Sequence, residues 1–458
     1  MGITYFFLDG QRCGWLGRAH SCPARFVLEE AHDVDSTLFH EFANQMDSRG
    51  SNAVPHQTIV FRDLLKHIPW GELARLVEKH NAEPDRRGLK TRPHLIAMIH
   101  AQLFGAHGLR EIEANLKSHA GKLYHLGGCT ISRATLSTAN RERPAEVFAA
   151  LLSVMMEQLQ RGYRRKIRDC VRLIDSTGIR LTRLSGKWAT FSTDVCGAKA
   201  HIVYDPDADQ PLYLMLTAAN VNDITAAKAM PIERGATYVF DLGYYDYAWW
   251  ALLHEADCRI VTRLKSNTPF RVIEERPLEP GSAILSDRIG HLPKRLAASR
   301  RNPMSAPVRE IRLLNDSGKQ LRILSNDLTA SAQEIADLYK RRWAIELFFR
   351  WVKQTLKITH IFGASENAVR IQIAVALITF ILLRLGHDAN RATITPLAFA
   401  RLIRANLMHR RSIAELLACK PPPKPPQPQI AFDFEPYATR AAQRRRAGRL
   451  PAFLEPAA

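Results

Sequence analysis

Three isolated acidic residues have the types and contexts that metal-dependent chemistry requires. Asp175 ends the apolar run "CVRLID", Asp241 ends "ATYVFD", and Glu346 lies alone among cations in "YKRRWAIELFFRWVKQTLKI". An unpaired buried charge is costly, and clustered carboxylates repel one another unless a cation lies between them. If the three meet, their oxygen atoms favour Mg²⁺ or Mn²⁺. Two such ions about 3.5–4 Å apart could activate the attacking oxygen and stabilise the leaving oxygen in a phosphodiester displacement.

Each aspartate considered alone has a simpler explanation. Asp175 precedes Ser-Thr-Gly and Asp241 precedes Leu-Gly, so either carboxylate could cap a turn. The set of three acids, two on strands and one on a helix, favours a shared site.

The segment 339–358 contains no Gly or Pro and predicts one helix of about five turns. At about 100° per residue, five side chains fall in a band about 80° wide. They are Tyr339, Arg342, Glu346, Arg350 and Lys353. Trp343 and Phe349 flank this band. A solvated face with i,i+4 salt bridges would explain the charges, but such a face is usually broad and has polar borders. A narrow band with aromatic borders favours a face that points into a cleft.

Apolar residues fill much of the remaining circumference of this helix. They are Leu338, Ile345, Phe348, Val352 and Leu356. We expect these side chains to be buried.

From about residue 168 the sequence predicts a mixed α/β core. Short apolar or alternating runs predict its strands, which are "CVRLID", "AKAHIVYD", "PLYLMLTAA", "ATYVFD" and "CRIVTRLK". The run "YDYAWWALLHEA" predicts a helix between the last two strands. Strands followed by helices are typical of this fold class.

Residues 266–328 interrupt the core with a β-rich insertion. Its hairpin is expected to turn at Asp316-Ser317-Gly318. A capping box from Ser331 to Glu334 then begins the helical segment that carries Glu346. A second apolar helix is expected over about 366–386.

The sequence pattern over residues 57–163 predicts an all-helical region. Two short helices, "LREIEANLKSH" and "TISRATLSTANRER", flank a turn at Gly127-Gly128, and this pattern suits a helix-turn-helix reader of DNA. The second helix would present Ser132, Arg133, Thr135, Ser137 and Asn140. An ordinary helical bundle explains the same pattern, so both interpretations stay open.

The 458-residue chain is strongly basic, with 64 Lys and Arg against 45 Asp and Glu and a formal net charge of +19. Such a surface suits a polyanion, most commonly nucleic acid, although a solvated basic surface gives the same balance. Seven scattered cysteines without a CxxC pair predict reduced thiols in a cytosolic protein. The longest apolar run, 373–383, is too short to span a bilayer, so we expect no membrane partner.

Four residues match a known signature at full spacing. Tyr339, Arg342, Glu346 and Lys353 fit the Y-(2)-R-(3)-E-(6)-K pattern of transposases of the insertion-sequence-four family. "IDSTGI" resembles the first-Asp motif of that family and "FDLGYYDY" resembles its second. The resemblance covers about 57–390. One departure is Leu242, which follows the second Asp where many relatives have Arg.

The resemblance implies a ribonuclease-H-like catalytic core in which Asp175, Asp241 and Glu346 bind two metal ions, Mg²⁺ with Mn²⁺ as a substitute. It implies that water attacks a phosphodiester at the end of the element and that the freed 3′-OH then attacks. In relatives a terminal hairpin forms and reopens before strand transfer. The implied partner is double-stranded DNA, both terminal inverted repeats and target, bound by a dimer in the synaptic complex. The implied location is the bacterial cytoplasm, at the nucleoid.

The expected fold is therefore mixed α/β, a ribonuclease-H-like catalytic core with a β-rich insertion, preceded by an all-helical DNA-binding domain. The expected divisions are a poorly patterned segment at 1–54, the helical domain at 55–164, the catalytic domain at 165–265 and 329–395, the insertion at 266–328, and a C-terminal extension at 396–458 with a disordered Pro-rich and basic tail.

Further residues are expected to contact DNA. Arg342 and Lys353 are placed to hold phosphates, while Tyr339 and Trp343 could bind a phosphate or stack near an unpaired base. The other expected DNA contacts are Arg350, Lys199, His201, Arg263, Lys265 and Arg133. For Lys199, His201, Arg263 and Lys265, ordinary surface cations are an equally good explanation.

Two other functions remain open at this point. One is a nuclease of the same chemical class that hydrolyses DNA without strand transfer, and the other is a DNA-binding protein whose catalytic site has decayed. The insertion and the separate helical region argue against a simple nuclease. The intact acids and neighbouring cations argue against decay.

Met46 opens a plausible true start, because residues 1–45 lack a clear pattern. We hypothesise that these residues belong to an over-extended reading frame. N-terminal sequencing of protein expressed from its native gene is expected to begin at Met46 or Asp47. A sequence beginning at Met1 or Gly2 would refute the hypothesis.

Overall fold

The computed structural model describes residues 4–5, 59–84, 87–160, 170–192, 195–278, 283–295, 301–314, 318–356, 358 and 360–418. Apart from the two-residue strand β1 (Thr4–Tyr5), which pairs with a later strand, the segment 1–54 lies outside these residues. The sequence after residue 420, with the predicted disordered tail, lies outside them as well.

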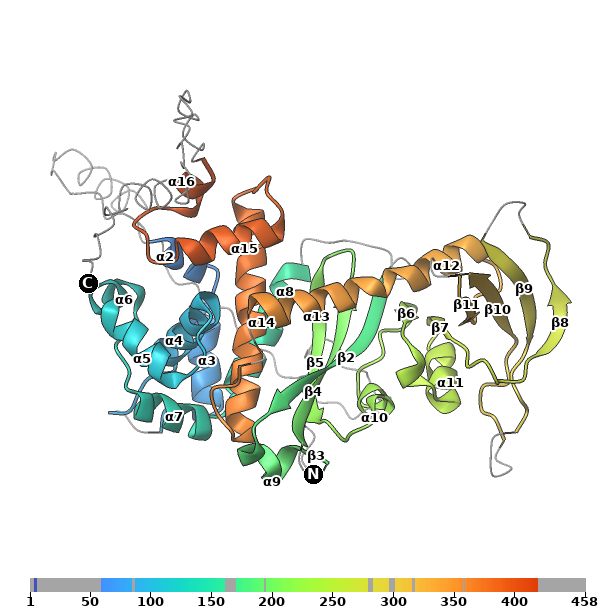
Figure 1. Cartoon of the computed structure of the whole chain (residues 1–458), viewed down its shortest axis with the longest axis horizontal. Helices are drawn as coiled ribbons and strands as arrows, with labels where there is room; N and C mark the ends of the chain where they lie inside the picture. The colour runs from blue at the N-terminus through green and yellow to red at the C-terminus, as the bar shows by residue number, and fades with distance from the viewer. Residues whose placement is uncertain are drawn as a thin grey trace, which may run out of the picture. The chain divides into compact units, whose positions relative to one another are not determined.

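The described parts of residues 59–160 are helical, as the sequence predicts. The helices are α2 (Val60–Leu65), α3 (Trp70–Lys79), α4 (Thr91–Phe104), α5 (Leu109–Ser118), α6 (Ala120–Leu123), α7 (Arg133–Glu142) and α8 (Ala145–Gln160) (Figure 1). The connection between α5 and α7 is longer than the predicted tight turn, because it contains α6 and the 3-10 turn η1 (Tyr124–Leu126). Leu123 and Leu126 are buried there, so apolar burial stabilises the extra turns.

Helix α14 (Glu366–Ala389) joins this helical region to the rest of the structure. It packs against α2, α4, α7, α8 and α13. Helix α15 (Pro396–Ala405) also packs on it, and the short α16 (Ile413–Ala418) follows. By length and hydropathy α14 could cross a membrane, but 83% of its most apolar window is buried inside the protein. It therefore packs as a core helix, as the sequence predicts.

A buried polar network ties α4, α7 and α14 together. His94 Nε2 lies 2.8 Å from Asn140 Oδ1, and Arg143 donates to His94 Nδ1 at 2.8 Å. Burial, followed by the charge of Arg143, lowers the pKa of His94 to about 3, so the imidazole is neutral. Asn367 of α14 donates to the carbonyl oxygens of Asn140 and Arg143 at 3.0 and 2.6 Å. The network fixes the end of α7 against α14.

The strands form one sheet in the order β1-β5-β4-β2-β6-β7-β11-β10-β9-β8. Its core strands are β2 (Val171–Leu181), β4 (Val195–Asp205), β5 (Gln210–Ala218), β6 (Thr237–Val239) and β7 (Arg259–Arg263), with the short β3 (Thr190–Ser192) on β4. Strands β2, β4 and β5 pair antiparallel, whereas β6 runs parallel to β2 and β7 parallel to β6. The fold is mixed α/β with a ribonuclease-H-like core.

The strand that contains Asp175 is longer than predicted. The sequence indicated a strand that ends at Asp175, but β2 continues to Leu181. The difference arises because β4 pairs with β2 from Leu173 to Leu181, which supplies hydrogen-bond partners after the acid. Asp241 does follow a strand, since β6 ends at Val239. One aspartate therefore lies within a strand and the other in the turn after one.

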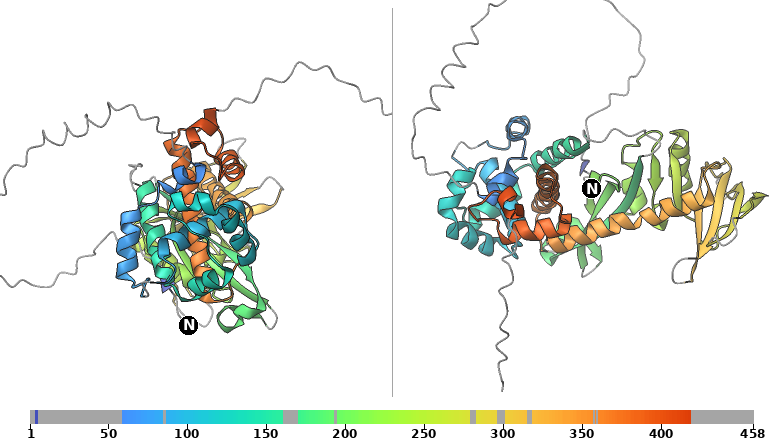
Figure 2. Two further views of the ribbon diagram at one scale, coloured as in Figure 1. Left: turned by 90° about the vertical axis from the view of Figure 1, so that its left-hand side faces the viewer. Right: turned by 90° about the horizontal axis from the view of Figure 1, so that it is seen from above.

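Helices cover both faces of the core sheet. Helices α12 (Ala332–Arg341) and α13 (Trp343–Thr355) run end to end along one face and contact β7 and β2 (Figure 2). Helices α10 (Asp223–Lys228) and α11 (Tyr247–Glu255) cover the other face, where they share a buried cluster with Ile174 and Val203.

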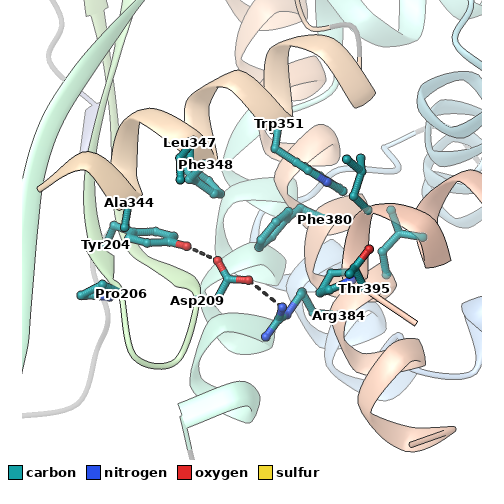
Figure 3. A pocket seen from close by; sticks show the side chains of 13 residues that line it. Tyr204, Pro206, Asp209, Ala344, Leu347, Phe348, Trp351, Phe380, Arg384 and Thr395 are labelled. Atoms are coloured by element: carbon teal, nitrogen blue, oxygen red, sulfur yellow. Dashed lines mark hydrogen bonds and ion pairs between the residues drawn. The ribbon is translucent and has the colours of Figure 1, made fainter. Parts of the chain in front are cut away.

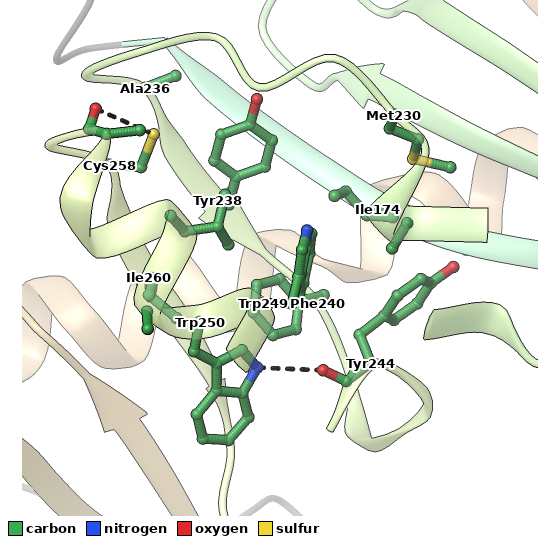
Figure 4. Close-up of a cluster of buried hydrophobic side chains, with 14 of the residues drawn as sticks. Ile174, Met230, Ala236, Tyr238, Phe240, Tyr244, Trp249, Trp250, Cys258 and Ile260 are labelled. Atoms are coloured by element: carbon green, nitrogen blue, oxygen red, sulfur yellow. Dashed lines mark hydrogen bonds between the residues drawn. The ribbon is translucent and has the colours of Figure 1, made fainter. Parts of the chain in front are cut away.

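Aromatic side chains dominate the buried cluster on the α10–α11 face. Phe240, Tyr244, Trp249 and Trp250 pack within it, and Trp250 Nε1 donates to the Tyr244 carbonyl oxygen at 3.1 Å (Figure 4). Phe240 immediately precedes Asp241, and Tyr244 ends the 3-10 turn η4 (Leu242–Tyr244) that follows it. This packing anchors the loop that carries Asp241 at both ends.

The described parts of 266–328 extend the core sheet. They contain β8 (Arg271–Glu275), β9 (Ile284–His291), β10 (Val308–Leu314) and β11 (Gln320–Ser325), all paired antiparallel. The predicted hairpin is β10–β11, although Asp316 and Ser317 of its turn lie outside the described residues. Because β11 pairs with β7, this β-rich segment continues the core sheet.

A buried ion pair ties this β-rich segment to the start of α12. Arg309 on β10 donates to both oxygens of Asp287 on β9, at 2.7 and 2.6 Å, and the two side chains are 2% and 4% exposed. Arg309 also donates to the carbonyl oxygen of Ala330, just before the helix. Ser331 then caps α12 by accepting from the Glu334 N–H at 3.0 Å, which is one half of the predicted capping box, while the Glu334 carboxylate pairs with Arg259 at 2.7 Å.

Asp287→Ala is expected to destabilise the protein by about 3–5 kcal/mol, because it leaves the buried Arg309 without its counter-charge. Thermal unfolding followed by circular dichroism measures the change. Asp287→Leu combined with Arg309→Met should recover most of the loss. Arg75→Ala, which removes an exposed helical ion pair with Glu72, is the matched control and should change the midpoint little. An Asp287→Ala midpoint equal to that of the control would contradict this role.

Candidate active site

Asp175, Asp241 and Glu346, here called the carboxylate cluster, come from β2, the loop after β6, and α13. In the parallel pair β2–β6, Leu173 is opposite Val239. Asp175 and Asp241 each lie two residues further along, so they occupy the same level of the sheet. Arg342 brings in the third acid, since its guanidinium lies 2.6 Å from Glu346 Oε1 and 3.7 Å from Asp175 Oδ2.

The pKa of Asp175 depends on its burial and on the charged groups around it. Burial, together with the charges of Asp241 and Glu346, raises the pKa of Asp175 to about 6. The hydrogen bond from the Ser176 N–H to Asp175 Oδ1, at 2.7 Å, and the charge of Arg342 oppose this rise. The cluster therefore concentrates negative charge that one guanidinium offsets only in part.

The helix that carries Glu346 is interrupted at Arg342. The sequence predicted one helix over 339–358, but α12 ends at Arg341 and α13 begins at Trp343. The Arg342 N–H donates to the Tyr339 carbonyl oxygen at 3.1 Å, and the Ile345 N–H donates to the Arg342 carbonyl oxygen at 3.2 Å. These i to i+3 bonds form a tighter turn. The turn lies at the residue whose side chain reaches both Asp175 and Glu346.

Arg342 is a strongly held cation. Burial lowers its pKa, but Tyr339, Glu346 and Asp175 more than offset that effect, so the pKa lies above its ordinary value. The guanidinium also lies over the Tyr339 ring, 5.9 Å from the ring centre. Tyr339, Arg342 and Glu346 thus form a connected group at the cluster.

The predicted apolar positions of these helices are buried, but the charged band is only partly inside. Trp343 is 52% exposed, and Arg350 is exposed with its guanidinium 5.8 Å from the Trp343 ring centre. Lys353 is half-buried, and burial lowers its pKa. Within the described part of the chain, no ion pair to Lys353 is found. Its charge is thus available for an external anion.

The chemistry of the cluster suits a hard divalent cation. Its donors are all carboxylate oxygens, and their mutual repulsion favours a positive charge among them. Among the described residues, no group of three or more His, Cys, Asp or Glu side chains is closed tightly enough to hold an ion. In the structure Arg342 supplies the positive charge between Asp175 and Glu346.

The loop after β6 holds the Asp241 carboxylate in place. The Gly243 N–H donates to Asp241 Oδ1 at 2.8 Å, so the side chain caps its own turn. A Cβ atom at Gly243 would lie 3.1 Å from Asp241 Oδ1 and 3.2 Å from Asp223 Oδ2. Glycine at this position therefore lets two carboxylates approach the same point.

Asp223 is an acid that the sequence analysis missed. Its Oδ1 accepts from the Ser176 hydroxyl at 2.9 Å and from Lys199 Nζ at 3.1 Å. The signal was weaker than that of Asp241, because a short connection separates Asp223 from the apolar strand β5 (Gln210–Ala218) before it. Its partners Ser176 and Lys199 lie 47 and 24 residues away in the sequence, so no local pattern reveals them.

The expectation that His201 contacts DNA is wrong. His201 is 0% exposed, and its Nε2 lies 2.9 Å from Thr217 Oγ1. Burial lowers its pKa to about 4, so it is neutral near pH 7. The cause is register, because His201 is opposite Ser176 and so faces the α10 side of the sheet, away from the side chain of Asp175.

Lys199 lies on the same face and is already paired. Its Nζ contacts Asp223 and donates to the Val221 carbonyl oxygen at 3.0 Å. Its charge therefore balances Asp223, and a contact with DNA would have to compete with that pair.

A basic groove of about 720 Å³ lies next to the Asp241 loop, between β7 and the β10–β11 hairpin. Its lining includes Leu242 and the cationic residues Arg263, Lys265, Arg312, Lys319 and Arg322. Part of this charge is used within the protein, because Arg322 pairs with Glu310 and donates to the Thr268 carbonyl oxygen. Lys265 Nζ lies 4.4 Å from the centre of the Tyr245 ring. The predicted Arg263 and Lys265 therefore share one concave surface.

A second cavity, of about 300 Å³, lies beside α13 (Figure 3). It is on the side of the helix that faces away from the carboxylate cluster. Leu347, Phe348 and Trp351 contribute apolar walls. Its polar groups satisfy one another, since Tyr204 and Arg384 both donate to Asp209. The cavity does not open onto the carboxylate cluster, because the residues of α13 that line it differ from those that face the cluster.

In the helical region, the predicted DNA-facing residues of α7 divide into two groups. Ser132, Arg133, Thr135 and Ser137 are exposed, whereas Asn140 is buried and bound to His94. Asn140 is thus structural, and its prediction as a DNA reader is wrong. Arg133 is the first residue of α7, and its backbone N–H donates to Glu113 at 2.9 Å.

Comparison with known proteins identifies two matching family models. A transposase DDE domain matches residues 166–382, which include the entire carboxylate cluster. A domain of unknown function, DUF4372, matches residues 56–129 within the helical region.

Individual relatives agree with the first model. The chain is 42% identical over 291 residues to a putative transposase, y4zB, of Sinorhizobium fredii, an alignment that covers 64% of this chain and 81% of the relative. It is 28% identical over 282 residues to a probable transposase for insertion sequence element IS5377 of Geobacillus stearothermophilus, covering 59% and 71%. A solved structure of a piggyBac transposase synaptic complex with hairpin DNA matches with a TM-score of 0.41 and 11% identity, over 88% of each chain.

The alignment with the Sinorhizobium relative spans most of that protein, and the matched DDE domain contains the residues gathered at the sheet. The chain belongs to the DDE transposase family.

Proposed function

We propose that this insertion-sequence transposase cuts and joins DNA with Asp175, Asp241 and Glu346 as its metal-binding catalytic residues. The observation that carries the proposal is the meeting of Glu346 and Asp175 at Arg342, with distances of 2.6 Å and 3.7 Å, beside Asp241 at the same level of the sheet. The three acids come from separate elements, and each would be costly if buried alone. A cluster of this kind at a perturbed carboxyl group is typical of a catalytic centre.

DDE transposase domains depend on divalent metal ions, and we assign Mg²⁺, with Mn²⁺ as a substitute. Asp175, Asp241 and Glu346 would hold a two-metal site. Bound there, the ions supply Lewis acidity to the attacking and leaving oxygens of a phosphodiester. The protein contributes the rigid placement of the carboxylates, through β2, the Gly243 turn and α13.

Positive side chains around the cluster would hold the DNA backbone. Arg342 can form two parallel hydrogen bonds to a phosphate, and Lys353 offers a point charge two turns after Glu346. Tyr339 lies under Arg342, where its hydroxyl could bind the same phosphate. The exposed pair Trp343 and Arg350 offers a stacking surface for an unpaired base.

The basic groove supports a path for DNA away from the cluster. Arg263 and Lys265 line it beside Leu242, so a strand leaving Asp241 would meet these cations next. The β10–β11 hairpin adds Arg312 and Lys319 to the same surface. In the helical region, the exposed Arg133 at the start of α7 is assigned to recognition of the terminal inverted repeats.

Several finer assignments belong to the same proposal. The Tyr339, Arg342, Glu346 and Lys353 spacing supports membership of the insertion-sequence-four family. Residues 55–164 would bind DNA, and 165–265 with 329–395 would form the catalytic domain with 266–328 as its insertion. A dimer would pair two DNA ends in the synaptic complex, acting on the bacterial nucleoid in the cytoplasm.

One assay distinguishes this function from its alternatives. The purified chain is incubated with Mg²⁺ or Mn²⁺ and a duplex carrying the inverted repeat found in the DNA that flanks the gene. Cleavage followed by joining to a target duplex supports transposition. Cleavage alone would indicate a nuclease, and binding without cleavage would indicate a decayed relative.

Glu346→Ala and the isosteric Glu346→Gln are expected to abolish cleavage, because each removes a carboxylate ligand, while DNA binding is largely preserved. Single-turnover cleavage and a filter-binding assay measure the two properties. Glu366→Gln, at the exposed start of α14 where Glu366 pairs with Arg370, is the control and should cleave normally. Wild-type cleavage by the Glu346 variants would show that the cluster is not the catalytic site.

Lys353→Ala is expected to weaken binding of the cleaved end and to reduce the slope of log affinity against log salt by about 0.9, the value for one lost phosphate contact on duplex DNA. Binding is measured at several salt concentrations. Lys340→Ala is the control, since this exposed lysine of α12 lies outside the charged band. An unchanged slope for Lys353→Ala would argue against its phosphate contact.

A further inference from the structure

Asp223 makes polar contacts with residues from two strands beneath the carboxylate cluster. It is the first residue of the short helix α10, and its Oδ1 accepts from Ser176 Oγ at 2.9 Å and Lys199 Nζ at 3.1 Å. His201 Nδ1 lies 3.7 Å from the same oxygen. We propose that Asp223 is a positioning residue that holds Asp175 and Asp241 in their productive arrangement. This inference rests on the function proposed above.

The link to Asp175 runs through Ser176. The Ser176 backbone N–H donates to Asp175 Oδ1 at 2.7 Å, and its hydroxyl donates to Asp223 at 2.9 Å. Ser176 therefore contacts one carboxylate with its backbone and the other with its side chain, on opposite faces of β2. Asp223 fixes the rotation of Ser176, and with it the donor that orients the Asp175 carboxylate.

The link to Asp241 runs through Gly243. The Gly243 N–H holds Asp241 Oδ1, and Asp223 Oδ2 lies against the same glycine, 3.2 Å from the position of a Cβ atom. The turn η4 also contacts α10. Asp223 thus packs against the turn that orients the second carboxylate.

The charges of all three aspartates act on the buried side chain of Tyr244. Its side chain is 1% exposed, and burial raises its pKa well above the ordinary value, with Asp175, Asp223 and Asp241 adding to the rise. A buried phenol whose pKa is raised by three negative charges stays protonated. Its neutral side chain therefore adds no further negative charge near the acids.

Lys199 makes a third carboxylate tolerable so close to the cluster. It pairs with Asp223 on the α10 face of the sheet, while Arg342 pairs with Glu346 and Asp175 on the α13 face. Each face therefore has its own cation. Asp223 therefore accepts from Ser176 beside a cation of its own, with no contact to Arg342 needed.

A purely structural role for Asp223 would resemble that of Asp246. Asp246 also lies at a helix start, caps α11 by accepting from the Trp249 N–H at 2.8 Å, and pairs with Lys228 at 2.6 Å. It differs from Asp223 because, among the residues that the structure describes, it contacts α10 and α11 and not the cluster. Asp246→Ala is therefore the matched control for the loss of a helix-start carboxylate and its lysine.

The test uses full-length protein, with Mn²⁺ alone as the metal probe and the inverted-repeat duplex as the DNA probe. Calorimetric titration measures Mn²⁺ affinity without DNA, single-turnover cleavage measures the reaction, and metal-free binding measures DNA affinity. Asp223→Ala is expected to lower both Mn²⁺ affinity and the cleavage rate by about 10-fold, the usual effect of removing a group that orients a metal ligand. DNA affinity should stay near the wild-type value.

Ser176→Ala should also lower both Mn²⁺ affinity and the cleavage rate. The double variant should be no worse than Asp223→Ala, because both changes break one chain of contacts. Asp223→Asn keeps an oxygen acceptor for Ser176 and should recover part of the Mn²⁺ affinity. Asp246→Ala is expected to lose thermal stability while keeping Mn²⁺ affinity and cleavage.

The proposal is overturned if Asp223→Ala binds Mn²⁺ and cleaves like Asp246→Ala. If Asp223→Ala does not fold, Ser176→Ala decides alone, and wild-type Mn²⁺ affinity for that variant overturns the proposal. Glu346→Gln separates this outcome from failure of the proposed function. Loss of Mn²⁺ binding in Glu346→Gln, together with wild-type behaviour of Asp223→Ala, would reject the positioning role alone.

Discussion

The site depends on how the protein keeps like charges close together. Asp175, Asp241 and Glu346 repel one another, and the guanidinium of Arg342 offsets that repulsion from its position between Asp175 and Glu346. The tight turn between α12 and α13 lies at the residue that makes both contacts. A straight helix would preserve the spacing of the signature residues but not this local turn.

On the α10 face of the sheet, a different cation balances another carboxylate. Asp223 and Lys199 form their own pair there, and the buried aromatic cluster holds the Asp241 loop between Phe240 and Tyr244. The carboxylates thus lie between two layers, each of which is neutralised and packed separately.

The β-rich segment between β7 and α12 supports the core sheet and the start of α12, and it also carries cationic side chains. Because β11 pairs with β7, the segment extends the core sheet, and Arg309 ties it to the loop that begins α12. The segment therefore fixes the start of α12, the helix that directly precedes α13 and Glu346. The continuous sheet also brings the cations of the basic groove together, since they come from β7, β10 and β11.

Much of the fold and the three principal acids could be predicted from sequence because they depend on local patterns. The helical period buries Ile345 and Phe348, alternation and turn residues mark β4 and β5, and the signature spacing singles out Glu346. The domain divisions and the roles of individual site residues remain predictions.

Other features depend on partners far away in the chain. Strand β2 passes Asp175 because β4 supplies its hydrogen bonds, and His201 turns away from that acid because pairing puts it opposite Ser176. Asn140 is buried because His94 and Asn367 meet it from other helices. The sequence by itself determined which residues carry charge and which segments are helix or strand, since these follow from neighbours a few positions apart. Only the tertiary structure decided which charges face one another, because that depends on register and packing between segments tens of residues apart.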